Sequence, residues 1–151
     1  MVYLKDSKIQ VKSSCQVAKV FQDLLLLEAE IDREKEHFYV MHLNAKSQVK
    51  MVELVSLGSL TASVVHPRET FRRAVLAGSA SIIVAHNHPS GEVEPSSEDT
   101  KTTKVLFEAG RVLGISLLDH LIFADGTFFS FQDNRIRQIE DTVTGKEKTN
   151  L

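Results

Sequence analysis

The spacing of hydrophobic positions changes several times along the chain, and these changes predict an alternation of helices and strands. Apolar residues recur at helical spacing over 13–31, where Ser13 or Ser14 can serve as the N-cap. Three stretches that follow show strand-like patterns, with a turn between the first two and a glycine before the third. These expected strands are 38–44, 49–57 and 61–66.

A helix, a strand and a second helix are expected next. Pro67 suits the first position of a helix that Gly78 would end. Residues 80–85 form a continuous apolar run, which is typical of a strand buried on both faces. A loop over 86–95 then leads to a helix over about 96–113. On the helix that starts at Pro67, the apolar residues expected on the inner face are Phe71, Ala74 and Val75. On the helix over about 96–113 they are Val105, Leu106, Ala109, Val112 and Leu113.

The pattern ends in a hairpin and a tail. Residues 115–123 and 128–131 read as two strands joined by an Asp-Gly turn. From Asp133 the chain is polar with charges of both signs, which predicts a short helix passing into disorder. The element order predicts a single mixed α/β domain. Its expected parts are a helical extension over 1–33, the domain proper over 34–132 and a polar tail over 133–151.

Composition narrows the class of protein. The chain is 42% hydrophobic and 25% charged, as in an ordinary globular domain, and its net charge of −2 gives no overall attraction to nucleic acid. The single cysteine, Cys15, excludes an internal disulfide and a cysteine-based zinc site, and is expected to be a small buried residue. The longest apolar run, 24–27, is too short to cross a membrane, and residues 1–10 lack the apolar region of a signal peptide. A cytoplasmic protein that does not bind membranes is expected.

The stretch AHNHPSG, residues 85–91, carries the clearest chemical signal. Residues two apart in a strand point to the same side, so His86 and His88 would face one way at the carboxyl end of a buried strand. Zinc binds histidine nitrogen at ~2.0–2.1 Å, and a catalytic zinc needs three protein ligands. Asp99, in the first turn of the next helix, is the candidate for the third ligand.

The same residues also admit other roles. Asp99 stands three residues after Ser96, which is the spacing of a capping box. An HNH nuclease disperses its motif over a ββα unit, so the contiguous letters H-N-H match it by accident. A zinc deaminase needs P-C-x-x-C and a serine hydrolase needs G-x-S-x-G, and the chain contains neither. Spacing alone leaves both a metal site and a capped loop open.

The longer pattern H-x-H-P, six residues, S-x-x-D resembles the JAMM signature of MPN-domain metalloproteases. The surrounding sequence, with PRE, HNHPSG and LDH in the same order, resembles the bacterial RadC family, also called UPF0758, from about Glu34 to Phe131. The resemblance implies a single MPN/JAMM domain with a cytidine-deaminase-like mixed β-sheet flanked by helices. It also implies hydrolysis of a peptide or isopeptide bond in a peptide or protein substrate.

The resemblance further implies roles for individual residues. The implied zinc ligands are His86, His88 and Asp99. Ser96 is the implied oxyanion donor, and Glu36 is the implied general base. Glu34 would point to the same side if the strand began early, so it is the alternative base. If neither glutamate is the base, both belong to a run of solvated charges. His120 is expected to be a buried, hydrogen-bonded histidine, with Asp119 as its companion behind the ligands.

A second function stays open at this point, namely a non-catalytic or DNA-repair-associated module that binds protein or nucleic acid. RadC proteins carry a DNA-repair label, and longer members have a helix-hairpin-helix segment ahead of this domain. Only 35 residues precede Glu36, which is short for that segment, and the net charge is slightly negative, so nucleic-acid binding is not expected. Inactive MPN domains usually lack part of the signature, whereas every ligand type is present in this sequence.

Overall fold

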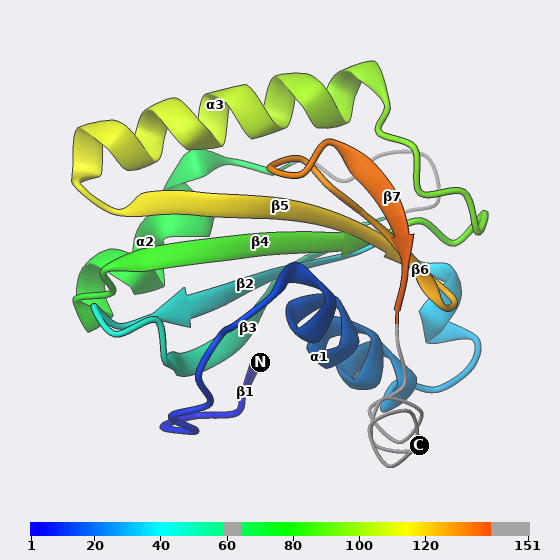
Figure 1. The fold of residues 1–151 in the computed structure, drawn as a ribbon, viewed down its shortest axis with the longest axis horizontal. Coiled ribbons are helices and arrows are strands. Elements are labelled where there is room, and N and C mark those ends of the chain that lie inside the picture. Colours follow the sequence, from blue (N-terminus) through cyan, green and yellow to red (C-terminus); the bar gives the residue numbers. More distant parts are fainter. Residues whose placement is uncertain (59–64, 140–151) are drawn as a thin grey trace, which may run out of the picture.

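The computed structural model describes residues 1–58 and 65–139, and in this part of the chain seven strands form one mixed sheet (Figure 1). Neighbouring strands are antiparallel except β4 and β5, which are parallel. In spatial order the strands are β1 (Val2–Tyr3), β3 (Val49–Leu57), β2 (His37–Leu43), β4 (Ser81–Asn87), β5 (Ser116–Ala124), β6 (Thr127–Ser130) and β7 (Arg135–Gln138).

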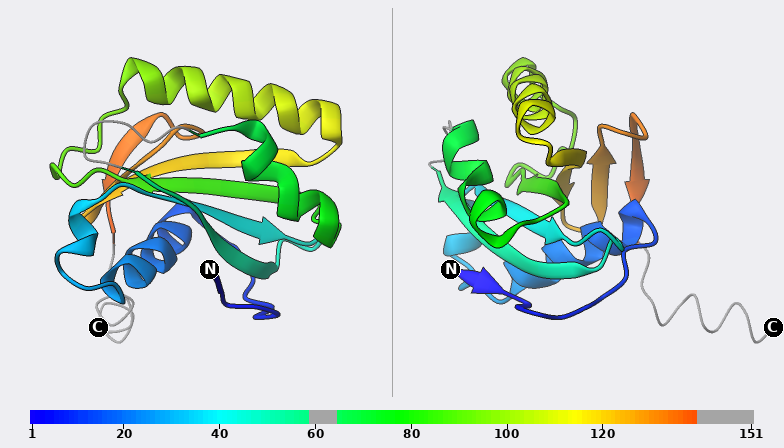
Figure 2. Two further views of the ribbon diagram at one scale, coloured as in Figure 1. Left: turned by 180° about the vertical axis from the view of Figure 1, so that it is seen from behind. Right: turned by 90° about the vertical axis from the view of Figure 1, so that its left-hand side faces the viewer.

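Helices cover both faces of the sheet. Helix α1 (Ser14–Leu26) packs on one face, and α2 (Pro67–Ala77) and α3 (Ser97–Leu113) pack on the other (Figures 1 and 2). A short 3-10 turn, η1 (Asp32–Glu34), precedes β2. Helix α3 is the crossover that the parallel pair β4 and β5 requires. The end of β4 and the start of α3 therefore lie at the same edge of the sheet.

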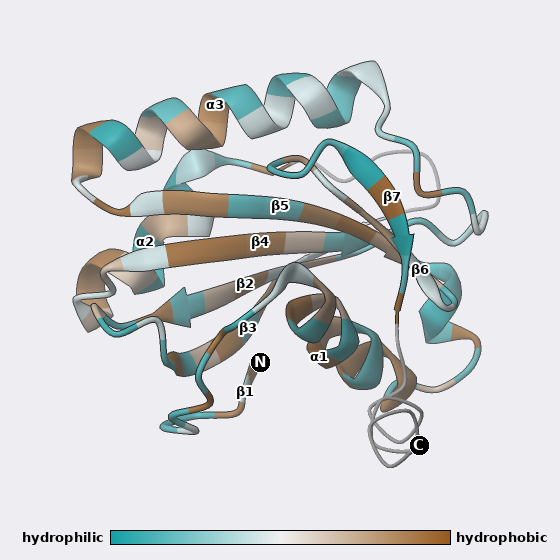
Figure 3. Cartoon of the chain, viewed as in Figure 1, coloured by the Kyte–Doolittle hydropathy of each residue, from teal (hydrophilic) through white to brown (hydrophobic). Residues whose placement is uncertain are grey.

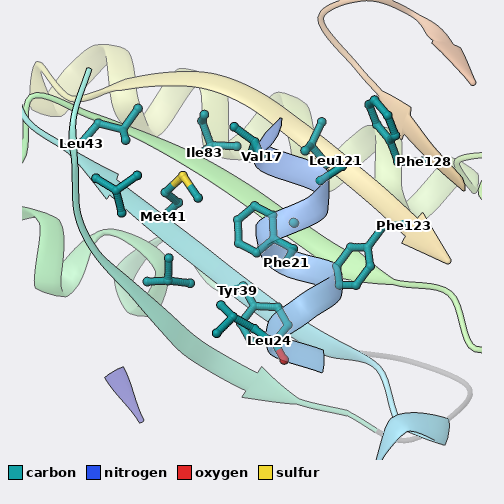
Figure 4. Packing of buried hydrophobic residues seen from close by; sticks show 14 residues of the cluster. Val17, Phe21, Leu24, Tyr39, Met41, Leu43, Ile83, Leu121, Phe123 and Phe128 are labelled. Atoms are coloured by element: carbon teal, nitrogen blue, oxygen red, sulfur yellow. The ribbon is translucent and has the colours of Figure 1, made fainter. Parts of the chain in front are cut away.

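Two layers of apolar side chains hold the helices to the sheet. In Figure 3, β4 is hydrophobic along most of its length, and all seven of its residues are buried, as the apolar run predicted. Figure 4 shows the layer beneath α1, which includes Val17, Phe21, Leu24, Tyr39, Met41, Leu43, Ile83, Leu121, Phe123 and Phe128. The layer beneath α2 and α3 consists of Phe38, Val40, Phe71, Ala74, Ile82, Val84, Leu106, Ile115 and Leu117.

The predicted fold class is confirmed, and so are several element boundaries. The strand expected over 49–57 is β3, and the Asp-Gly hairpin joins β5 to β6. Ser13 is the N-cap of α1 and accepts the Gln16 amide at 3.1 Å. Gly78 ends α2 in the left-handed conformation, with φ of 63°. Glycine favours this conformation because it has no Cβ.

The predicted inner face of α3 is right for Leu106, which is buried, and for Ala109, which packs against the core. It is wrong for Val105, Val112 and Leu113, which are 53%, 87% and 48% exposed, and the other buried residue of this helix is Gly110. Gly110 lies so close to the start of β5 that a Cβ atom there would collide with a backbone carbonyl oxygen. The close approach turns the 106–110 side of the helix inward. On α2, Phe71 and Ala74 are buried as predicted, but Val75 is 54% exposed.

The predicted C-terminal helix is also wrong, because residues 135–138 form strand β7 and pair with β6. Strand β1 was not predicted, and the strand expected over 61–66 falls mostly outside the described residues. The strand that carries His86 extends to Asn87, two residues beyond the expected end. Cys15 is only partly buried.

The expected division of the chain at residues 33 and 132 stays a prediction. Helix α1, which lies in the expected extension, contributes four buried residues to the core: Val17, Ala18, Phe21 and Leu24. Within residues 1–58 and 65–139, no helix is long and apolar enough to cross a membrane.

Candidate metal centre

Three segments bring the predicted ligands together at one edge of the sheet. His86 lies at the end of β4, His88 follows in the loop, and Asp99 lies in the first turn of α3. Strand β2 runs antiparallel to β4, and its Phe38 pairs with His86. The start of β2, with Glu36 just before it, therefore lies beside the ligands.

The three side chains form a compact triangle. The Nε2 atoms of His86 and His88 are 3.0 Å apart, and each lies 3.2 Å from a different carboxylate oxygen of Asp99. Tetrahedral ligands at ~2.0–2.1 Å from a zinc ion are about 3.3 Å from one another, so these separations fit the edges of such a site. In the described part of the chain, this is the group of histidine and acidic residues that could hold a metal ion.

The hydrogen bond to the other ring nitrogen of His88 defines which tautomer it adopts. Nδ1 of His88 lies 2.7 Å from the backbone carbonyl oxygen of Glu92. A carbonyl oxygen can only accept, so Nδ1 carries the proton and donates it. In the neutral ring, Nε2 then has a lone pair, and this lone pair is directed into the triangle.

A longer chain of hydrogen bonds has the same effect on His86. The Thr103 hydroxyl donates to the Asp99 carbonyl oxygen at 2.7 Å, so its oxygen accepts from Nδ1 of His120 at 2.6 Å. Complete burial holds the pKa of His120 well below its usual value, so its Nε2 is unprotonated and accepts from Nδ1 of His86 at 2.8 Å. His86 therefore also presents the lone pair of Nε2 to the triangle.

The charge balance of the triangle favours a cation. Burial raises the pKa of the Asp99 carboxyl, but its contacts with the His86 and His88 rings outweigh burial and hold this pKa well below its usual range. Burial lowers the pKa of the His88 ring, but Asp99 and the Glu92 carbonyl outweigh it, so this pKa is raised. Two lone pairs and a carboxylate therefore attract positive charge, which a metal ion or a proton can supply.

Asp99 forms the capping box that its spacing allowed and also belongs to the triangle that could hold a metal ion. Its Oδ2 accepts the Ser96 amide at 2.9 Å, and Ser96 Oγ accepts the Asp99 amide at 3.0 Å, which is a complete capping box. The same carboxylate faces both histidines. The cap and the possible ligand are thus one group, and Ser96 is fixed at the border of the triangle.

Glu36, the predicted general base, lines a cavity beside the triangle. A cavity of about 650 Å³ opens in front of the triangle, and the Glu36 side chain, about half-buried, lines it together with His88 and Asp99. Burial raises the pKa of Glu36, and the nearby His86 and His88 rings offset only part of this rise. Glu34 lines the same cavity but is exposed. The arrangement favours Glu36 over Glu34, and the roles of both stay predictions.

Asn87, the residue between the two histidines, has a positioning role that sequence reasoning missed. It is 2% exposed, and its Oδ1 accepts the His37 amide at 2.6 Å. Its Nδ2 donates to the carbonyl oxygens of Lys35 and Arg33 at 3.0 and 3.4 Å. One side chain thus holds the backbone on both sides of Glu36. A buried amide between two ligands was the available signal.

The two residues expected behind the ligands behave differently. His120 is buried and touches His86, as described above. The Asp119 carboxylate accepts from Ser130 Oγ at 2.6 Å and from the backbone amides of His120 and Gln132 at 2.8 and 3.0 Å. Asp119 therefore holds the end of the β5–β6 hairpin, and its hydrogen bonds do not reach the ligand side chains.

A mixed sheet with a His-His-Asp group at the carboxyl end of β4 defines an α/β domain with side chains that could hold a metal ion. The chain belongs to the family of RadC-like JAB domains, whose sequence model matches residues 11–136. This confirms the RadC resemblance.

The relatives are UPF0758 proteins of bacteria and archaea. One from Alkaliphilus oremlandii is 48% identical over 112 residues, which is 74% of this chain and 48% of that protein. One from Methanosarcina acetivorans is 50% identical over 102 residues, or 68% of this chain and 44% of that protein. A third, from Methanococcoides burtonii, is 40% identical over 132 residues, which is 87% of this chain and 56% of that protein. This chain therefore spans about half the length of these relatives.

Proposed function

We propose that this domain is a zinc-dependent hydrolase that cleaves a peptide or isopeptide bond. The observation that carries the proposal is the triangle of two Nε2 lone pairs and one carboxylate, with edges of 3.0–3.2 Å, beside a half-buried glutamate. Membership of the RadC-like JAB family supports the same chemistry.

His86, His88 and Asp99 would hold the metal. Two imidazoles and one carboxylate suit zinc, and three protein ligands are the number that a catalytic zinc site uses. When bound, zinc supplies Lewis acidity, which acidifies water and polarises a carbonyl oxygen. The hydrogen bonds of His86 to His120 and of His88 to Glu92 would keep both rings in the tautomer that can ligate.

Glu36 would move the proton. Water attacks the carbonyl carbon, the C–N bond breaks, and the proton that Glu36 takes from the water goes to the leaving nitrogen, so the products are a carboxylate and an amine. A raised pKa suits this exchange because the carboxyl group must both accept and return a proton. Ser96 Oγ, already accepting from the Asp99 amide, has one proton to donate to the carbonyl oxygen.

The charge around the site favours a polypeptide over nucleic acid as the substrate. Between His88 and Asp99 the loop and the first turn of α3 contain Glu92, Glu94 and Glu98 and no lysine or arginine. Glu34 and Glu36 line the facing side of the cavity. These carboxylates would repel phosphate groups, because binding of nucleic acid depends on cationic contacts to phosphates.

The test is elemental analysis of the purified protein beside a His86→Ala/His88→Ala variant whose fold is checked by circular dichroism. About one zinc ion per chain is expected in the wild type and none in the variant. The zinc-loaded protein is then incubated with a mixture of peptides from digested proteins, and new amino termini are identified by mass spectrometry. A wild type that takes up no metal from zinc at neutral pH would overturn the proposal.

A further inference from the structure

A second cavity adjoins the candidate metal centre on the other side of the His88–Pro89 segment. It measures about 270 Å³ and, like the cavity in front of the triangle, is lined by His88 and Pro89. Its other walls come from the last turns of α1, the end of β5 and the β5–β6 turn. The remaining lining residues are Gln22, Leu25, Leu26, Arg33, Asn87, Gly91, Phe123, Ala124 and Asp125.

Several polar groups in these walls hydrogen-bond within the protein. Gln22 Oε1 accepts the Gly126 amide at 3.0 Å, and the Asn87 amide holds the backbone ahead of β2. Arg33 donates to the carbonyl oxygens of Glu28 and Leu26 at 2.9 and 2.8 Å, which ties η1 to the end of α1. These hydrogen bonds join separate segments into one wall. The polar atoms that make them are already paired within the protein.

The surface left to contact a ligand is mainly apolar. Leu25, Phe123 and Ala124 line the cavity, and Leu26 is 47% exposed beside them. The two charged lining residues, Arg33 and Asp125, are of opposite sign, so the cavity has no net formal charge to select a charged group. An apolar side chain of moderate size would cover Leu26 and displace water from these walls.

We infer that this cavity is a specificity subsite that takes an apolar side chain, such as leucine or methionine, from the substrate residue next to the cleaved bond. The shared wall carries the inference, since His88 presents Nε2 to the ligand triangle and also borders the second cavity. A substrate chain that crosses the His88–Pro89 segment would present neighbouring side chains to the two cavities. The inference rests on the proposed hydrolase function and specifies its substrate class.

Binding can be tested without cleavage. The probe is N-acetyl-leucine amide, titrated into the 15N-labelled full chain, with N-acetyl-lysine amide as the comparison. Leucine amide should shift the amide signals of Gly91, Phe123 and Ala124, and lysine amide should not. Leu26→Asp should weaken this binding about 10-fold or more, because an apolar contact is replaced by a charge. Equal shifts from both probes, or none from leucine amide, would overturn the inference.

The control variant is Leu27→Asp. Leu27 is the next residue, is 74% exposed and does not line the cavity, so the same charge there should leave leucine-amide binding unchanged. A second arm compares cleavage sites in the peptide mixture. Leucine-amide binding without cleavage of any peptide would contradict the hydrolase function, while the preference of the cavity for an apolar side chain would still hold. Cleavage with the same residue preference in wild type and Leu26→Asp would contradict the subsite and leave the function standing.

Discussion

The Nε2 atoms of His86 and His88 lie 3.0 Å apart, although each ring already donates its Nδ1 proton to another acceptor. Two neutral rings in this arrangement direct lone pairs at each other, which costs free energy unless a cation lies between them. Asp99 adds a negative charge at 3.2 Å from both nitrogens. The fold therefore strongly favours a positive charge between these side chains. Four predictions concern this triangle and its surroundings, and a fifth concerns Glu53 on β3.

Asp99→Asn should release the metal while the protein stays folded. Asparagine keeps an oxygen that can accept the Ser96 amide, so the start of α3 is preserved, but the negative charge is lost. Zinc affinity, measured by competition with a chromogenic chelator, should fall by more than the ~10–100-fold typical of changes behind a ligand. Ser96→Ala is the opposite control. It should cost about 1 kcal/mol of stability by loss of the cap and should keep the metal.

Glu36→Gln should keep the metal and lose turnover by ~10²–10⁴-fold, because the amide cannot carry the proton. The matched variant is Glu34→Gln, which changes the other glutamate in the same cavity and should leave kcat near the wild-type value. Metal content and kcat are measured on the same preparations. The opposite pattern, with Glu34→Gln inactive and Glu36→Gln active, would exchange the two assignments.

Thr103→Val should weaken zinc binding by ~10–100-fold, because His120 loses the acceptor that holds its Nδ1 proton and so no longer keeps Nε2 open to His86. Thr100→Val is a close control. The Thr100 hydroxyl likewise donates to the carbonyl oxygen four residues earlier, that of Ser96, at 3.2 Å. Its replacement should leave zinc affinity unchanged. Equal losses in both variants would attribute the effect to the helix and not to the histidine pair. Thr103→Ser should restore binding.

Asn87→Leu should separate positioning from ligation. The leucine removes the acceptor of the His37 amide and the donor to the Lys35 carbonyl, so a stability loss of about 1–3 kcal/mol is expected in urea denaturation. The ligands His86 and His88 remain, so metal is retained, whereas kcat falls because Glu36 is less well placed. Loss of metal together with activity would show instead that the whole edge of the sheet had moved.

The acid stability of the fold should depend on Glu53. Burial raises the pKa of this carboxyl, but hydrogen bonds from His42 and Arg73 outweigh burial, so its pKa in the folded state is lowered. The unfolded chain then binds more protons in acid. This stabilisation is complete above the unfolded pKa, about 4.3, and is lost as pH falls through the folded value. The free energy of unfolding should therefore drop less steeply below about pH 4.3 in Glu53→Gln than in the wild type.

The sequence predicted that His86, His88 and Asp99 lie close together, because the signals for this arrangement are local. The two-residue spacing of His86 and His88 needs only that the strand continue, and it does continue to Asn87. The acidic residue in the first turn of α3 is equally local. The contact between His86 and His120 could not be predicted in the same way, because it depends on the register of β4 against β5, in which Val84 pairs with His120.

Other parts of the fold depend on contacts that residue type does not reveal. The close approach at Gly110 sets the inner face of α3. Hydrophobic periodicity does not reveal this approach and therefore pointed to Val112, which is 87% exposed. The polar stretch 135–138 becomes a strand because β6 offers it backbone hydrogen bonds, and because Arg137 lies 5.3 Å from the ring of Phe128. Composition favoured a short helix passing into disorder there.

Strand β2 is buried along its whole length, so hydrophobicity does not distinguish one register from the next. The Asn87 amide does, because it recognises backbone groups on both sides of Glu36. Residues 86–88 thus contain two of the proposed ligands and also the amide that fixes the backbone on both sides of Glu36, the proposed base. One residue inserted among these three would therefore alter the proposed ligand set and the position of the proposed base together.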